Sequence, residues 1–201
     1  YNMSDLKDFN RTIIDNIPFE VKQVNDFPNH YFYKPAVLYS FKRFRIGAEI
    51  GFHSTGSRVS SKDYSAEYKF DMKIKNFAPN LIIDYSLFNL KSKYTFGIYS
   101  GTGIIKSTLK LSESLFVFEE DMLNVSYTYY SINYYVTPGL YFNYSLLRYL
   151  DIGLKYGYLF QFGDNILLDE WENELYNSNT PIQTDWNGMR MGIFLNFNIF
   201  P

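Results

Sequence analysis

The stretch MRMGIFLNFNIFP, residues 189–201, decides the fold because its side chains alternate in character from one residue to the next. Arg190 and Gly192 fall on one face of a strand together with two asparagines. The other face carries no polar atom except thioether sulfur: Met189, Met191, Ile193, Leu195, Phe197 and Ile199. A period of two residues is typical of a β-strand with one apolar face, so this stretch predicts such a strand.

The same period recurs along the chain, and helical spacing is scarce. Seven further segments alternate in this way: residues 17–24, 33–41, 43–53, 77–88, 94–104, 131–147 and 150–162. Short turns are predicted at one end of these strands: residues 42–43, 90–93 and 147–149. Longer loops are predicted at the other end: residues 54–65, 107–126 and 163–185. Eight strands with this asymmetry of turns are typical of an outer-membrane barrel.

The composition excludes several classes of protein. The chain of 201 residues has no cysteine, which excludes disulfides, thiolate metal sites and a lipid-anchoring cysteine. A net charge of −2 gives no reason to expect a nucleic-acid partner. Tyrosine and phenylalanine are abundant, at 20 and 19 residues, yet the mean hydropathy is only −0.23 and no apolar run is long enough for a membrane helix. Because Tyr1 comes first and no signal peptide precedes it, we expect a processed, exported protein.

The apolar faces of the predicted strands contain no charged residue, and aromatic residues gather where these faces end. The opposite faces are rich in glycine, asparagine, serine and tyrosine rather than in lysine and glutamate. A charge facing lipid at mid-bilayer costs about 2–4 kcal/mol, whereas water would tolerate it. The pattern therefore favours lipid outside and polar groups inside, with a soluble β-barrel or β-sandwich containing an aromatic core as the alternative.

Three prolines occur inside predicted strands, at Pro35, Pro79 and Pro138. Proline cannot donate a hydrogen bond to a neighbouring strand. The apolar phase also slips between Ile74 and Phe77. Together these features predict a β-bulge near Pro79, repeated at the other two prolines.

The final strand carries the pattern of an assembly signal, polar-x-Gly-x-x-apolar-x-aromatic, at Arg190, Gly192, Leu195 and Phe197. With this signal and the alternating strands, the chain resembles the small eight-stranded outer-membrane β-barrels, the group of the OmpA transmembrane domain, OmpX and the porin-like barrels. Its tyrosine, phenylalanine, asparagine, isoleucine and lysine content and its proline-containing strands resemble such barrels from Bacteroidota.

The resemblance implies an all-β, transmembrane, up-and-down antiparallel barrel in the bacterial outer membrane. It implies that the N-terminus and the tight turns are periplasmic and that the long loops are extracellular. Outer-membrane lipid, lipopolysaccharide and the barrel assembly machinery are the partners implied. We expect residues 1–16 to form an N-terminal periplasmic segment, either with a short helix capped by Ser4 or as a disordered leader, and residues 17–201 to form the barrel.

Charged residues on the inward faces predict an ion-pair network in the barrel interior, because charges of both signs in a narrow space pair with one another. The network comprises Arg45, Glu49, Asp84, Asp151, Lys155 and Arg190. It predicts either a structural plug or the filter of a narrow, gated channel.

The last predicted loop has apolar residues at helical spacing, with acidic residues on the remaining face. The apolar set is Leu167, Leu168, Trp171, Leu175 and Tyr176. This pattern predicts a short amphipathic helix that packs on the barrel rim or binds a partner protein.

The sequence shows no pattern for a metal ligand set, a phosphate loop or a cofactor. His53 and Ser54 are adjacent and would point to opposite faces of a strand, which argues against a catalytic pair. We therefore expect a non-enzymatic scaffold or a small subunit of an envelope complex, with a narrow channel or a lipid A-modifying enzyme as the alternatives.

Overall fold

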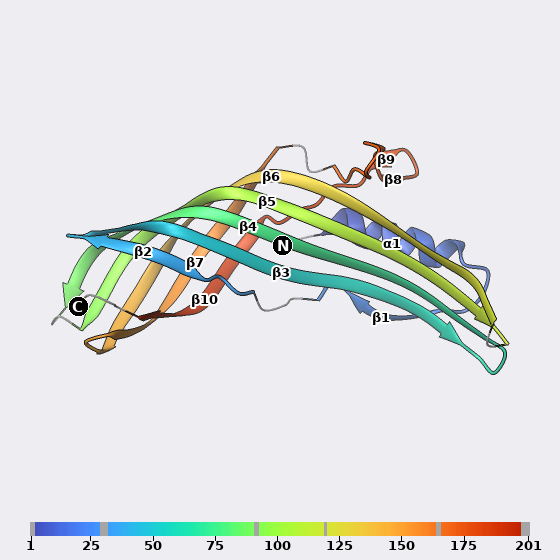
Figure 1. Cartoon of the computed structure of the whole chain (residues 1–201), viewed down its shortest axis with the longest axis horizontal. Helices are drawn as coiled ribbons and strands as arrows, with labels where there is room; N and C mark the ends of the chain where they lie inside the picture. Colours follow the sequence, from blue (N-terminus) through green and yellow to red (C-terminus); the bar gives the residue numbers. More distant parts are fainter. Residues whose placement is uncertain (1–2, 29–31, 91–92, 119, 164–165, 198–201) are drawn as a thin grey trace.

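The structure is a computed structural model that describes residues 3–28, 32–90, 93–118, 120–163 and 166–197 (Figure 1). One helix, α1 (Ser4–Asn16), precedes the strands. The strands are β1 (Lys22–Asp26), β2 (Ala36–Phe41), β3 (Phe44–Lys62), β4 (Ala66–Leu90), β5 (Tyr94–Val117), β6 (Glu120–Leu147), β7 (Leu150–Phe162), β8 (Tyr176–Asn177), β9 (Thr180–Pro181) and β10 (Gly188–Phe197). The prediction of an all-β fold is confirmed.

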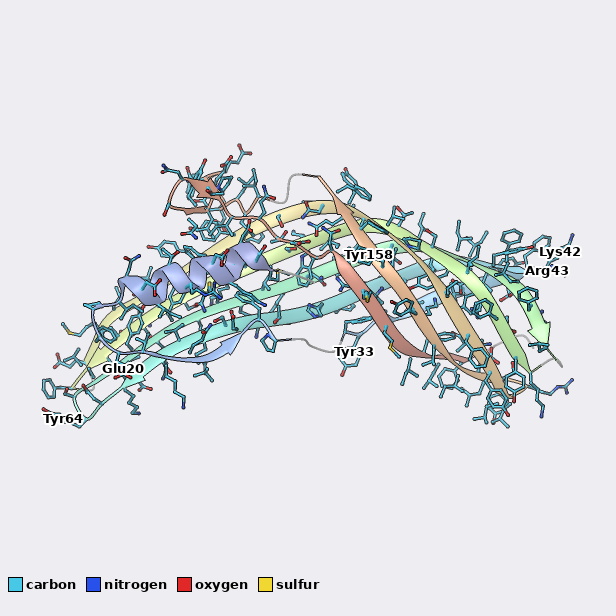
Figure 2. The ribbon with its side chains drawn as sticks, turned by 180° about the vertical axis from the view of Figure 1, so that it is seen from behind. Glu20, Tyr33, Lys42, Arg43, Tyr64 and Tyr158 are labelled. Carbon is cyan, nitrogen blue, oxygen red and sulfur yellow. The ribbon has the colours of Figure 1, made fainter. Side chains whose placement is uncertain are left out.

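Eight of these strands form one antiparallel sheet in the order β1-β3-β4-β5-β6-β7-β10, with β2 also paired to β3. Strands β1 and β2 lie along the same edge of β3, β1 beside Ser57–Ser60 and β2 beside Phe44–Glu49. β8 and β9 form a separate short hairpin. The sheet is long and curved. β7 and β10 run obliquely to β3, β4 and β5 in the part of the sheet that contains β2 (Figures 1 and 2).

Three central strands are far longer than a bilayer requires. β4, β5 and β6 have 25, 24 and 28 residues, or about 80 Å or more at about 3.3 Å per residue. The loops predicted at residues 54–65 and 107–126 are therefore wrong, because most of these residues continue the strands. The β3–β4 turn that remains spans only residues 63–65.

The polarity of the sheet faces reverses along β4. Tyr68, Phe70 and Ile74 lie on the inward face, and the same face continues into the buried polar residues Asn80 and Asp84. On the outward face, charged residues give way at Phe77 to apolar residues. The phase slip noted in the sequence is this reversal.

The bulge predicted near Pro79 is wrong. β4 pairs with β3 in one unbroken register, and beyond Pro79 it resumes pairing with β5 without a shift, at Asn80 opposite Gly103. Pro138 interrupts pairing with β7 in the same way and again without a shift. Pro35 precedes β2, and its carbonyl accepts a hydrogen bond from the amide of Ile50. Because proline has no backbone N–H to donate, pairing is lost locally at Pro79 and Pro138, but the register is unchanged.

The reversal divides the sheet into two halves. The α1 half consists of α1, β1 and residues 54–62, 66–76, 106–117 and 120–131. The belt half consists of β2, β7, β10 and residues 44–53, 77–90, 94–105 and 132–147. We call the exposed apolar side chains of the belt half the belt: Val37, Tyr39, Phe41, Phe44, Ile46, Ile50, Phe52, Phe77, Leu81, Ile83, Tyr94, Ile98, Ile104, Ile132, Tyr134, Leu140, Phe142, Ile152, Leu154, Tyr156, Tyr158, Phe160, Met189, Met191, Ile193, Leu195 and Phe197.

The helix α1 confirms the predicted N-terminal helix, but its cap and place differ from the prediction. It begins at Ser4, with Met3 in the cap position and no side-chain cap. Its Leu6 is fully buried in one hydrophobic core with residues of β3, β4 and β5. Figure 2 shows α1 at the end of the sheet opposite the turn at Lys42 and Arg43. The sequence analysis placed the N-terminus and the tight turns on the same side of the barrel, whereas α1 and the turn at residues 42–43 lie at opposite ends of the sheet.

Seven of the eight strands cross the belt half, because β1 lies only beside the α1 half. Among the described residues, β10 pairs with β7 and β2 pairs with β3, so neither is paired on its other side within the belt half. Each strand from β2 through β3, β4, β5, β6 and β7 to β10 is antiparallel to the next. The two edge strands, β2 and β10, therefore run in the same direction.

Candidate functional site

A buried ion cluster lies inside the belt half. Arg45 lies opposite Asp84 in the β3–β4 register, and its guanidinium is 2.8 Å from the Asp84 carboxylate. The Lys155 ammonium, on β7, is 3.6 Å from the other oxygen of Asp84. The Asp84 side chain is fully buried, so the two cations compensate a carboxylate that has no access to water.

Glu49 has a second set of partners. The Lys34 ammonium, from the segment before β2, is 3.0 Å from its carboxylate. The side-chain amide of Asn80 donates to Glu49 at 3.3 Å and to the hydroxyl of Tyr135 at 2.6 Å. The sequence analysis did not include Lys34, Asn80 or Tyr135 in the network, although the inward phase of β4 and β6 contains the last two.

The two remaining residues of the predicted network lie elsewhere on the interior face. Arg190 donates to the backbone carbonyls of Trp186, at 2.5 Å, and Met189, at 3.3 Å. Asp151 is buried at the start of β7, in register with Asn196. The structure thus places Arg45, Asp84 and Lys155 in contact and gives Arg190 backbone carbonyls to bind.

Large aromatic rings fill much of the remaining interior, and glycines leave the space for them. A Cβ atom on Gly139 would lie 2.5 Å from the Tyr99 ring, and one on Gly97 would lie 2.5 Å from the Tyr141 ring. The Arg45 guanidinium lies over the Tyr141 ring at 4.8 Å. The glycines spaced along β5 and β6 are therefore packing requirements of these rings.

Trp186 covers the interior where the two halves meet. Its ring nitrogen donates to the hydroxyl of Ser107 at 2.9 Å, and its backbone amide donates to the side chain of Gln161 at 2.7 Å. The His53 ring packs edge-on against it, with ring centroids 5.1 Å apart. No pattern in the sequence pointed to this role, because Trp186 follows the last predicted loop with no periodic neighbour.

A hollow of about 410 Å³ lies beneath Trp186. Its lining includes Phe32 and Lys34 on one side, Met189 and Arg190 of β10 on another, and His53 and Tyr135 within. It therefore lies at the seam between the segment before β2 and the edge strand β10. Phe32 is the nearest neighbour of Gly192 across this seam.

His53 and Ser54 lie on opposite faces of β3, as the spacing predicts. The hydroxyl of Thr55, which shares the face of His53, donates to the carbonyl of Pro28 at 3.0 Å. Among the described residues, no group of three or more histidine, cysteine, aspartate or glutamate side chains could hold a metal ion. In the same part of the chain, no helix has the length and apolar character to cross a membrane.

The amphipathic helix predicted for the last loop is wrong. The loop folds back on itself, and the Leu175 amide donates to the Leu167 carbonyl at 2.9 Å. Both leucines are buried in the core of the α1 half and are not available to a partner. Leu168 pairs with Tyr130 of β6, and Tyr176 begins the short strand β8.

The tip of this loop is held in a tight turn. The Asp169 carboxylate accepts hydrogen bonds from the backbone amides of Trp171 and Asn173, each at 2.8 Å, and from the Asn173 side chain at 3.0 Å. The Asn173 side-chain bond and these amides lower the pKa of Asp169. The turn presents the Trp171 side chain to solvent with 83% of its surface exposed.

The residues of the predicted assembly signal all lie on the edge strand β10. Arg190 and Gly192 lie on its interior face, and Leu195 and Phe197 lie on its outward face within the belt. The segment that follows Phe197 lies outside the described residues.

The chain matches no family model, no curated protein and no solved structure.

Proposed function

We propose that this chain is an outer-membrane β-barrel protein that serves as a membrane-anchored scaffold and binds a partner through its α1 half. The belt is the observation that carries the proposal. Its side chains are apolar and far more exposed than a water-soluble protein tolerates over one continuous surface: Val37 is 81% exposed, Leu81 64% and Ile193 75%. Contact with the acyl chains of lipid would make such an exposed apolar surface favourable.

The height of the belt supports a membrane position. On β4 the outward apolar residues extend from Phe77 to Leu87, about 33 Å along the strand at about 3.3 Å per residue. A strand tilted by about 40° would then cover about 25 Å, which matches the apolar band of outer-membrane barrels. Tyr85 and Tyr94 lie at the turn end of this band, where interfacial tyrosines are favoured.

Burial of the belt in lipid also requires that the two edge strands be closed. Each unpaired backbone group in hydrocarbon costs several kcal/mol, so a free β2 or β10 edge would be strongly unfavourable. Because seven strands cross the belt half and both edge strands run the same way, closure joins β2 to β10 in parallel. A Cβ atom on Gly192, on the interior face of β10, would lie 3.8 Å from the ring of Phe32, which precedes β2.

The filled interior favours a scaffold over an open channel. Asp84, with its two cations, and the buried rings of Tyr135 and Tyr141 occupy the centre of the belt half. The α1 half, by contrast, has a water-compatible outer face. The loop that packs against it through Leu167 and Leu175 exposes Trp171, and tryptophan often anchors protein interfaces.

Membrane anchoring is tested with an arginine on the belt. Ile193→Arg and Leu81→Arg place a charge against lipid at a cost of about 2–4 kcal/mol each, so we expect both variants to be lost from the membrane fraction. Ser112→Arg, on the outward face of the α1 half, is the matched control and should assemble normally. Wild-type protein that is monomeric and soluble without detergent would contradict the proposal.

The scaffold role is tested at the loop tip. Proteins that co-purify with the chain in mild detergent are compared for the wild type, Trp171→Ala and Tyr64→Ala, whose side chain is exposed in the turn between β3 and β4. We expect a partner to be lost from Trp171→Ala alone. An unchanged set of partners together with ion conductance after reconstitution would favour the channel alternative.

A further inference from the structure

Four lysines gather on the outward face immediately beyond the belt. Lys73 and Lys75 lie on β4, two and four residues before Phe77, and their side chains are exposed. Lys106 and Lys110 lie on β5, and Lys106 follows the belt residue Ile104 at the next outward position. The four residues therefore form a basic band at the level where the apolar surface ends.

The strand register places these charges against one another. Lys73 lies directly opposite Lys110, and Lys106 lies opposite Phe77. Like charges directly opposite on neighbouring strands destabilise a sheet. An anion between the ammonium groups would relieve this repulsion.

The protein does not supply those anions from the described residues around the band. The nearest outward carboxylate on β4, that of Asp71, is bound by both Nε and Nη2 of Arg58 at 2.6 and 2.9 Å. The positions beside the lysines on β3 and β6 include Gly56 and Thr128, which carry no charge. The Lys106 ammonium lies 5.9 Å from the Tyr130 ring centre, a contact that leaves its charge unneutralised.

We propose that Lys73, Lys75, Lys106 and Lys110 bind the phosphate groups of membrane lipids whose acyl chains cover the belt. This inference rests on the proposed membrane position of the belt, because that position places the lysines at the height of lipid headgroups. Lysine stems lie along apolar surface and carry their ammonium groups to the polar interface, so the residue type fits the place. Each such cation near an anionic lipid surface contributes about fivefold to binding.

The surface beside Lys73 leaves room for a headgroup. An open depression of about 400 Å³ lies there, and its lining includes Pro28, Ser54, Gly56 and the paired side chains of Arg58 and Asp71. It lies beside β3 between Phe52, which bridges to Tyr33, and Ser57, which pairs with Asp26 at the end of β1. The Ser54 hydroxyl and the Lys73 ammonium are donors there that suit phosphate oxygens.

The test compares two double variants that remove the same charge. The wild type, Lys73→Gln/Lys110→Gln and Lys22→Gln/Lys62→Gln are purified in a zwitterionic detergent and incubated with equimolar phosphatidylglycerol and phosphatidylcholine. Retained lipids are counted by native mass spectrometry. We expect the first variant to lose its preference for phosphatidylglycerol by about thirtyfold, and the control to keep it. Equal preference in the two variants would overturn the proposal.

A charge reversal separates a lipid site from a merely structural cluster. Lys110→Glu would pair with Lys73, so it should raise the unfolding temperature in detergent without lipid while it lowers retention of phosphatidylglycerol. Retention that is unchanged in Lys110→Glu, or abolished in the wild type by inorganic phosphate alone, would overturn the lipid assignment. A wild-type chain that inserts into bilayers without lipid preference contradicts this inference only, whereas a chain that does not insert contradicts the proposed function.

Discussion

Ile74 and Leu81 lie seven residues apart on the unbroken strand β4, and they show opposite uses of the same backbone. Ile74 belongs to the α1 half and is fully buried on its inward face, whereas Leu81 belongs to the belt and is exposed on the outward face. Neither the register nor the strand direction changes between them. A strand can therefore exchange the polarity of its two faces without any change in its pairing.

The cores of the two halves differ accordingly. The α1 half has an apolar interior closed by a helix, and its outer face carries charges such as the exposed pair of Arg58 and Asp71. The belt half has an interior of ions and hydroxyl groups and an apolar exterior. The α1 half thus resembles a water-soluble protein, and the belt half resembles one turned inside out.

The largest difference is expected between the two ion pairs. Asp84→Ala leaves Arg45 and Lys155 buried without a carboxylate, which should cost about 3–5 kcal/mol of unfolding free energy. Asp71→Ala breaks the Arg58 pair on the outer face of the α1 half, where solvent screens the charges, and should cost about 1 kcal/mol or less. Urea unfolding of both variants in detergent measures the two costs.

A double variant checks the cause of the larger loss. Arg45→Met added to Asp84→Ala removes one of the two uncompensated cations and should recover part of the lost stability. Equal costs for Asp84→Ala and Asp71→Ala would show that water reaches the interior of the belt half and that the inside-out description fails.

The sequence predicted the belt half well because its period of two extends over whole strands. Residues 150–162 and the strand that ends at Phe197 show it without interruption. The inward phase also selected Arg45, Asp84 and Lys155, which the structure places in contact. Lys34 was left out of the network although it falls on the polar phase of the predicted segment 33–41, and the structure keeps that register up to the Tyr33–Phe52 bridge.

The long strands of the α1 half were missed for a reason that the sequence contains. Tyr68, Phe70 and Ile74 also alternate, but with charged residues such as Lys69 and Lys73, so residues 66–76 were not included in any predicted strand. The alternation of apolar and polar residues continues through residues 66–76, but the apolar residues lie on the opposite face. This continuous alternation would have identified these residues as extensions of the strand. The reversal itself could be found at Phe77, where it was interpreted as a bulge.

The last loop was misassigned because its spacing fits two structures. Leu167 and Leu175 are eight residues apart, which suits two turns of a helix, but it also suits a loop whose ends lie side by side. Asp169 decides between them, since its carboxylate binds the amides of Trp171 and Asn173 and competes with helical hydrogen bonds. The positive φ of Glu172, at 62°, completes that turn.

A smaller difference in unfolding free energy is expected between leucine-to-alanine substitutions in the two halves. Leu109→Ala, fully buried in the α1 half, removes apolar contacts and leaves a cavity, at an expected cost of about 2–5 kcal/mol. Leu81→Ala, on the belt, removes the same atoms. If the belt faces lipid as proposed, fluid acyl chains fill the space, so the cavity contribution is absent and the cost should be clearly smaller. Urea unfolding in lipid nanodiscs compares the two variants directly. If Leu81→Ala costs as much as Leu109→Ala, then Leu81 packs against protein rather than lipid, and the belt would be an interface between chains.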